Sequence, residues 1–203
     1  AWSRAGRHTG RTDIPLTAAG EDQARATGIA LAGRTFGLAL VSPLGRARRT
    51  AQLIGHGEAE IEPDLAEWDY GPVEGLTRTQ VRENLGRPWS VLPAGVRVPV
   101  TISGTADLPP QLQRPDAGPG ELVEEVAARA ARVIARIEPT LRGGEDVLLV
   151  AHGHLLRIFA TTWLELHADV AERLALGTAA RSVLGYDRGT RALVHWNVVP
   201  ETA

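Results

Sequence analysis

Two histidines separated by one glycine follow an apolar run of strand length late in the sequence. The run Val147–Val150 passes into Ala151, His152, Gly153 and His154, after which a helical pattern begins. In α/β folds, ligands gather at the carboxyl ends of buried strands, and the first N–H groups of a following helix attract anions. Glycine allows a close turn there. The stretch predicts an anion site, with an ordinary strand-to-helix turn as the alternative.

A guanidinium is expected at the same edge of the sheet. Residues 36–41 read as a short apolar strand, and Ser42 with the proline after it indicates the start of a helix. Arg46 falls in the first turn of that helix, at the carboxyl end of its strand. Its position favours an anion contact and a solvent-exposed helix charge equally, whereas Arg48 is expected to face solvent.

An acid is expected in residues 64–75, which mix aromatics, carboxylates and glycine without helical or strand periodicity. Such a stretch inside a compact domain is often a binding loop. Its candidate acids are Glu67, Asp69 and Glu74. A carboxyl group packed beside aromatic rings suits proton transfer, although an isolated loop carboxylate is usually solvated.

The loop of residues 3–16 is the fourth candidate segment. It is rich in Gly, Arg, Thr and Asp, and we expect an ordered loop with little regular structure. The pair Thr9 and Gly10 is expected to offer backbone N–H groups to an anion. Its arginines are expected to be solvated charges.

Strands alternating with helices position these candidates in a three-layer α/β/α sandwich with a mostly parallel sheet. We expect a single domain over residues 1–203, in which the Pro- and Gly-rich residues 86–120 form a cap, a lid or a disordered insertion. Expected helices cover residues 18–31 (capped by Thr17), 77–85 (capped by Thr77), 121–142 (interrupted at Pro139), 155–164 and 169–174. Strands at 181–186 and 193–198 are expected to close the fold as a hairpin.

Composition excludes several classes of chemistry. The 203 residues carry a net charge of −2, so no general attraction to nucleic acid is expected, and no apolar run approaches the length of a membrane span. The sequence has no cysteine and no lysine, which excludes thiolate and Schiff-base chemistry. No signal peptide is visible, so the cytoplasm is the expected compartment.

Three segments together resemble the histidine phosphatase superfamily, which includes the cofactor-dependent phosphoglycerate mutases. They are residues 42–51 (SPLGRARRTA), residues 65–71 with Glu74-Gly75 (LAEWDYG…EG), and residues 150–153 (VAHG). Residues 6–17 also look like the segment after that family's first motif, especially in its phosphatase branch. The order and spacing of these motifs are specific, and the likeness covers nearly the whole chain outside residues 86–120.

The resemblance implies hydrolysis of small phosphorylated metabolites, such as sugar phosphates, through a phosphohistidine. Carried onto this chain, Arg46 and His152 would grip the phosphoryl oxygens and Glu67 would protonate the leaving oxygen and later activate water. Ser3, Thr9, Gly10 and Gly153 match positions near the phosphate or substrate, and Arg78 matches a substrate contact. The family needs no metal or other cofactor. A homodimer is an open expectation.

The family's attacking histidine belongs to an Arg-His-Gly motif that this sequence lacks. The motif is expected just upstream of Ala1, because Trp2 and Ser3 resemble the residues that follow it. The first, central strand would then be missing or truncated, leaving unpaired edges and an apolar slot. Three alternatives stay open: a phosphoglycerate mutase, an inactive phosphate-binding protein if the chain starts at Ala1, and, more remotely, a metal hydrolase using His152 and His154.

Overall fold

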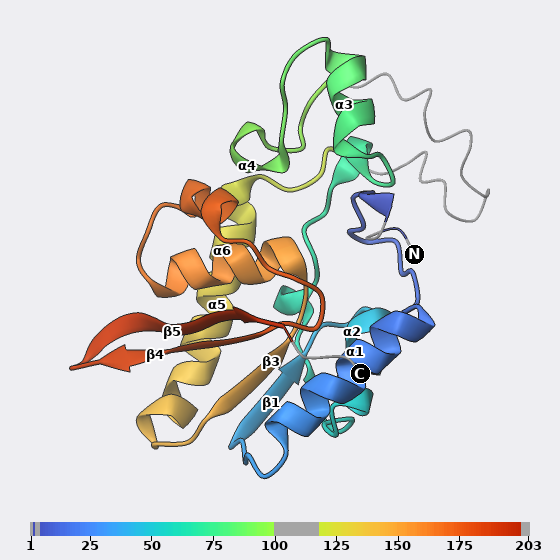
Figure 1. Ribbon diagram of the computed structural model, residues 1–203. Coiled ribbons are helices and arrows are strands. Elements are labelled where there is room, and N and C mark those ends of the chain that lie inside the picture. Colours follow the sequence, from blue (N-terminus) through green and yellow to red (C-terminus); the bar gives the residue numbers. More distant parts are fainter. Residues whose placement is uncertain (1, 3–4, 100–117, 200–203) are drawn as a thin grey trace.

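Three parallel strands form the sheet at the centre of the fold (Figure 1). The computed structural model describes residues 2, 5–99 and 118–199. Strands β1 (Leu38–Val41), β2 (Glu60–Ile61) and β3 (Val147–Val150) lie in the order β2-β1-β3. Val41 pairs with Val150 on one side and Ile61 on the other, so the carboxyl ends of β1 and β3 are level.

Helices cover both faces of this sheet, as Figure 1 shows. Helices α1 (Ala18–Leu31) and α2 (Gly45–Leu53) lie on one side, and α5 (Val123–Arg142) and α6 (Gly153–Trp163) on the other. Adjacent strand residues face opposite ways: Leu40 packs in the core with α5 and α6, whereas Val41 packs with α1 and α2. The expected three-layer α/β/α architecture is confirmed.

A separate two-stranded sheet lies beyond β3. Strands β4 (Arg181–Asp187) and β5 (Thr190–Val198) form the expected antiparallel hairpin. A cavity of about 1140 Å³ is lined by all of β3 and by residues 181–184 of β4. Within the described ranges, β3 is hydrogen-bonded only to β1, and its residues 147–149 are half-buried although apolar. The cavity therefore lies between β3 and the β4–β5 hairpin.

The remaining elements connect these layers. They are η2 (Pro63–Leu65), η3 (Gly71–Val73), α3 (Arg78–Leu85), α4 (Val91–Ala94) and η5 (Ala168–Arg173). Thr17 and Thr77 cap α1 and α3 as expected, through Gly20 N–H and Gln80 N–H. None of the helices in the described part of the chain is long and apolar enough to cross a membrane.

Two helix boundaries differ from expectation. Helix α2 begins at Gly45 instead of directly after Ser42, and Asp13 from the N-terminal loop accepts its first N–H groups, from Gly45 at 2.7 Å and Arg46 at 3.4 Å. Helix α5 continues through Pro139 without interruption. The apolar face of α5 is buried up to Ile137, and Leu141 beyond the proline packs against the same core, so tertiary packing outweighs the lost backbone bond.

Part of the 86–120 region is packed into the core. Trp89, Val91 and Val96 are buried in the same cluster as α5 and α6, and Trp89 Nε1–H donates to Gly95 O at 2.9 Å. Residues 100–117 lie outside the described residues. The cap or lid role of the region stays a prediction.

Candidate functional site

His152 lies two residues after β3 and directly before α6, in extended conformation (φ −130°, ψ 164°). Its Nε2 lies 2.7 Å from Ser42 Oγ, which is fully buried behind the end of β1. Burial lowers the pKa of His152 to about 4, opposed by the nearby Glu67 carboxylate. His152 is therefore neutral at neutral pH until an anion approaches. The sequence indicated Ser42 only as a helix cap and missed this contact.

His154 faces a different partner. Its Nδ1 lies 2.6 Å from the hydroxyl of Tyr70. Burial raises the pKa of Tyr70 well above its usual value and lowers that of His154 to about 3, so both groups are neutral and the tyrosine keeps its proton. His152 and His154 thus bond to different side chains. No group of three or more potential metal ligands occurs among the residues that the structure places.

Arg46 fastens the N-terminal loop to the rim of the sheet. Its NH1 donates to Thr12 O at 2.9 Å, and its NH2 donates to Thr9 O at 3.1 Å and Gly10 O at 2.9 Å. Burial lowers its pKa, opposed first by Glu67 and then by Asp13. NH1 also pairs with Asp13 Oδ1 at 3.8 Å, whereas Nε–H forms no hydrogen bond within the described structure, so Arg46 can hold the loop and still donate to an anion through Nε.

Glu67 caps the first turn of α6. Its Oε1 accepts N–H groups from Trp68 and Leu155, both at 3.0 Å, and its Oε2 accepts the N–H of His154 at 3.3 Å. Its side chain is buried. The expectation that the first N–H groups of this helix are open to an anion therefore holds only for Gly153. A Cβ at Gly153 would meet no atom within 4 Å, so the turn itself does not require glycine.

Gly10 does not offer its N–H group to a ligand as expected. That N–H donates to the buried carboxylate of Glu74 at 2.9 and 3.1 Å, and Thr12 N–H donates to the same group at 3.0 Å. A Cβ at Gly10 would lie 2.4 Å from Trp68 O, so glycine is needed for close packing. Thr9 does line the cavity. Ser3 lies outside the described residues.

The cavity beside β3 brings the main candidates together. Arg46, Glu67, Arg78 and His152 all line it, and Gly153 lies at the same end. Six arginines and two carboxylates line the cavity over the described ranges: Arg7, Arg34, Arg46, Arg78, Arg157 and Arg181 against Glu67 and Asp146. Such a surplus of positive charge favours an anionic ligand.

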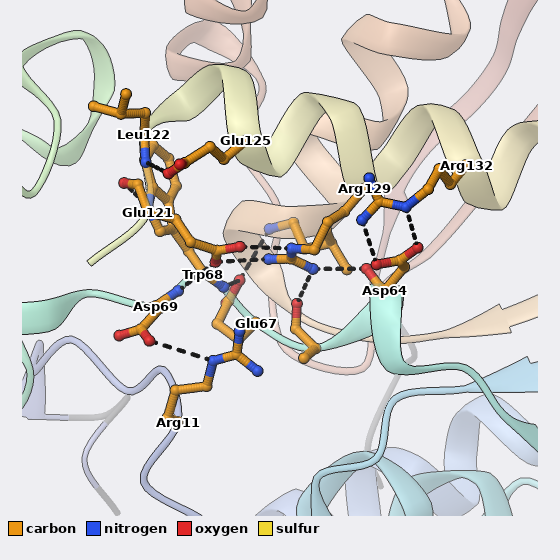
Figure 2. A network of polar contacts seen from close by, with 12 residues as sticks. Arg11, Asp64, Glu67, Trp68, Asp69, Glu121, Leu122, Glu125, Arg129 and Arg132 are labelled. Atoms are coloured by element: carbon orange, nitrogen blue, oxygen red, sulfur yellow. Dashed lines mark hydrogen bonds and ion pairs between the residues drawn. The ribbon is translucent and has the colours of Figure 1, made fainter. Parts of the chain in front are cut away.

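A polar network, drawn in Figure 2, anchors the segment that carries Glu67 to α5. At its centre, Glu121 and the buried Arg129 form a bidentate ion pair with bonds of 2.7 and 2.9 Å. Burial acts to raise the pKa of Glu121, but the hydrogen bonds from Arg129 and from Asp69 N–H outweigh it, so the pKa is lowered. At the outer side of the segment, Arg11 pairs with Asp69 at 3.6 Å. Sequence reasoning missed both Arg129 and Glu121, because a charged residue in an amphipathic helix is usually solvated.

Comparisons with known proteins agree with this geometry. The family model described as histidine phosphatase superfamily (branch 1) matches residues 1–199. An acid phosphatase of Mycobacterium tuberculosis is 34% identical over 200 residues, which cover 95% of this chain and 85% of the relative. Sedoheptulose 1,7-bisphosphatase of Saccharomyces cerevisiae is 30% identical over 218 residues, covering 93% of this chain and 72% of the relative.

Solved structures share the fold. The structure of the open reading frame Rv3214 from M. tuberculosis superposes with a TM-score of 0.81 at 34% identity, covering 98% of this chain and 92% of that one. A mycobacterial glucosyl-3-phosphoglycerate phosphatase in complex with VO3 gives a TM-score of 0.73 at 25% identity, with coverages of 97% and 93%. With its motifs at one sheet edge and the family match over nearly its whole length, the chain belongs to the histidine phosphatase superfamily, branch 1.

Proposed function

We propose that this protein hydrolyses small phosphorylated metabolites, including sugar phosphates, through a phosphohistidine intermediate. The observation that carries the proposal is the meeting of Arg46, Glu67 and His152 at one end of the cavity beside β3. A guanidinium and an imidazole can stabilise phosphoryl oxygens, and a carboxyl group can transfer the proton of the leaving oxygen. The relatives that are named as phosphatases support the hydrolytic reading.

The attacking histidine is proposed to come from an Arg-His-Gly segment preceding Ala1, which would fill the cavity as a strand between β3 and β4. The cavity is lined by the free edge of β3 and by β4, and a strand there would satisfy backbone groups on both sides. The carboxyl end of a strand parallel to β3 would lie beside His152. The nucleophile would thereby reach the phosphate position.

The proposed reaction has two balanced steps. The lone pair of the attacking imidazole forms a P–N bond while the P–O ester bond breaks, and Glu67 gives its proton to the leaving oxygen. Water then attacks phosphorus, the P–N bond breaks, and Glu67 takes one proton from that water. Arg46 and His152 stabilise the equatorial oxygens in both steps.

The substrate's remaining groups are proposed to contact Thr9 and Arg78. Both line the cavity, and Arg78 forms no hydrogen bond or ion pair with any residue that the structure describes. A free guanidinium near the site suits an additional anionic or hydroxylated part of the substrate. No cofactor takes part in the proposed reaction.

The test uses the protein expressed from the full coding region, assayed with p-nitrophenyl phosphate and glycerol phosphate. Turnover, vanadate inhibition and an acid-labile phosphoenzyme trapped in a rapid quench are expected. Replacing the upstream histidine by alanine should abolish all three, and a matched protein that begins at Ala1 should lack turnover. A full-length protein that is folded but neither hydrolyses these esters nor binds vanadate would refute the proposal.

Phosphoglycerate mutase is the second candidate, because several relatives 30–32% identical to this chain bear that name. The arginines of residues 86–120, Arg87, Arg97 and Arg114, include no adjacent pair of the kind expected in the mutase cap. Conversion of 3-phosphoglycerate to its 2-isomer in the presence of 2,3-bisphosphoglycerate, faster than hydrolysis, would favour the mutase.

A further inference from the structure

We infer that Arg129 on α5 is a positioning residue for Glu67, acting through the backbone on both sides of that acid. The inference rests on the proposed role of Glu67 in proton transfer. Arg129 forms no hydrogen bond or ion pair with Glu67 in the described structure and is not among the residues that line the cavity beside β3, so no contact with substrate is expected.

Every nitrogen of the Arg129 guanidinium donates at least one hydrogen bond. Nε and NH2 donate to the two carboxylate oxygens of Glu121, and NH1 donates to Asp64 O at 2.7 Å and Ala66 O at 2.9 Å. The side chain is only 9% exposed. The planar fork therefore fixes the backbone immediately before Glu67 in two places.

Glu121 fixes the backbone immediately after Glu67. Its Oε2 accepts Asp69 N–H at 2.8 Å, its carbonyl accepts the indole N–H of Trp68 at 2.8 Å, and its own N–H donates to Asp69 O at 2.9 Å. Arg129 holds the Glu121 carboxylate in the orientation that the first of these bonds requires. Together, Arg129 and Glu121 thus hold the backbone at residues 64, 66 and 69 and the side chain of residue 68.

Close backbone packing leaves this segment little room to move. A Cβ at Gly71 would lie 2.4 Å from Gly120 N, and one at Gly120 would lie 2.8 Å from Asp69 O. Both glycines have positive φ, of 49° and 76°. An acid must be placed accurately to act, and a misplacement of about 1 Å can cost about 100-fold in rate.

Arg132 offers a matched control on the same helix. It also binds Asp64, with two bonds of 2.7 Å, but to the carboxylate instead of the backbone carbonyl. Its side chain is 60% exposed. An exposed ion pair contributes little to stability and does not restrain the backbone beside Glu67.

The experiment compares leaving groups in the full-length protein. p-Nitrophenolate leaves without a proton, whereas the alkoxide of glycerol phosphate needs one. Arg129→Lys, which keeps a charge beside Glu121 but loses the fork, should lower kcat/KM for glycerol phosphate by about 10- to 100-fold and for p-nitrophenyl phosphate by less than about 3-fold. Glu67→Gln should show the same selectivity, and Arg132→Ala should stay within about 2-fold on both substrates.

A second measurement does not depend on activity. The Leu155 amide donates to Glu67, so its hydrogen exchange should be at least about 10-fold faster in Arg129→Lys and unchanged in Arg132→Ala. Trp68→Phe, which removes the indole bond to Glu121 together with part of a buried ring, serves if the lysine variant does not fold, and should shift both readouts in the same direction. Equal losses on both substrates, or an unchanged Leu155 amide in a folded variant, would overturn the inference. If the wild type hydrolyses neither ester, the proposed function fails, and the exchange result alone decides the role of Arg129.

Discussion

The two halves of the site are held in different ways. The acid half, Glu67 and its neighbours 64–70, is anchored by α5 and by the α6 amides, and its buried carboxylate is fully hydrogen-bonded. The phosphate half, Arg46 and His152, borders the open cavity, and His152 has one side-chain partner, Ser42. The carboxylate of Glu67 is thus held by three amides, whereas the imidazole of His152 is held by one hydroxyl group.

This difference agrees with the separate functions that are proposed for the halves. Donors that are already in place stabilise charge best, because no reorganisation is needed. The three amides that hold Glu67 are in place in the described structure. Variants of the acid half should therefore change rates according to the leaving group, and variants of the phosphate half should change them for every phosphoester.

The largest effect is expected for His152→Ala in the full-length protein. Loss of a donor to the transferring phosphoryl group typically lowers kcat by about 100- to 1000-fold. The loss should be equal for p-nitrophenyl phosphate and glycerol phosphate, as steady-state kinetics can measure. A loss confined to glycerol phosphate would show that His152 acts in protonating the leaving group, together with the acid half.

Arg46→Ala should lower kcat by about 100-fold, because it removes a phosphate donor and also frees the three carbonyls that Arg46 holds. Arg48→Ala, two residues away on the exposed face of α2, is the control and should change kcat by less than about 2-fold. Equal losses in the two variants would contradict the assigned geometry.

Acid should lower the stability of the fold through His152 and His154 before it acts on Glu121. His152 and His154 have folded pKa values of about 4 and about 3, below their usual 6.5, so the unfolded chain binds more protons over that interval. Stability should therefore be complete above pH 6.5 and fall as pH drops toward 4, by at most about 3 kcal/mol per histidine. The pKa of Glu121 lies below its usual 4.5, so the contribution of Glu121 to stability is complete above pH 4.5 and is lost only as the pH falls further.

Thermal melts between pH 7.5 and 4.5 measure this dependence. His152→Asn should flatten the curve, and Glu121→Gln should leave its slope unchanged while lowering the whole curve. A wild-type stability that stays constant from pH 7 to 5 would show that the histidines are accessible to protons in the folded state.

The smallest effect is expected for Arg78→Ala. Arg78 is exposed and belongs to neither anchored network, so its loss should raise KM by up to about 10-fold with kcat nearly unchanged. The measurement should use glycerol phosphate and a doubly anionic ester, with the larger rise for the latter. An equal fall in kcat would place Arg78 against the reacting phosphoryl group.

The elements that carry the site could be predicted from the sequence because local signals specify them. Apolar runs located β1 and β3, and Thr17 and Thr77 located two helix starts. The order of the motifs then placed Arg46, Glu67 and His152 at one edge. The carboxyl ends of neighbouring parallel strands lie at the same edge of the sheet, however the side chains pack.

What could not be predicted depends on contacts between distant segments. Ser42 reads as a local cap, yet its hydroxyl meets His152, 110 residues away, while Asp13 receives the first amides of α2. Gly10 reads as an anion-binding position, yet its amide belongs to Glu74. No local pattern tells which of several carboxylates accepts the hydrogen bond of a buried N–H group, because the partner depends on tertiary packing.

The two oxygens of Glu67 are unequal, and the proton that the proposed reaction places on this side chain has only one suitable position. Oε1 accepts two amides at 3.0 Å, and a hydrogen on that oxygen would face those N–H groups. Oε2 accepts one long bond of 3.3 Å, from His154. In the proposed reaction the proton would therefore be carried by Oε2, and the bond from the Leu155 amide to Oε1 would be kept in both steps. The proposed role as donor and then acceptor would thus leave the helix that begins beside Glu67 in place.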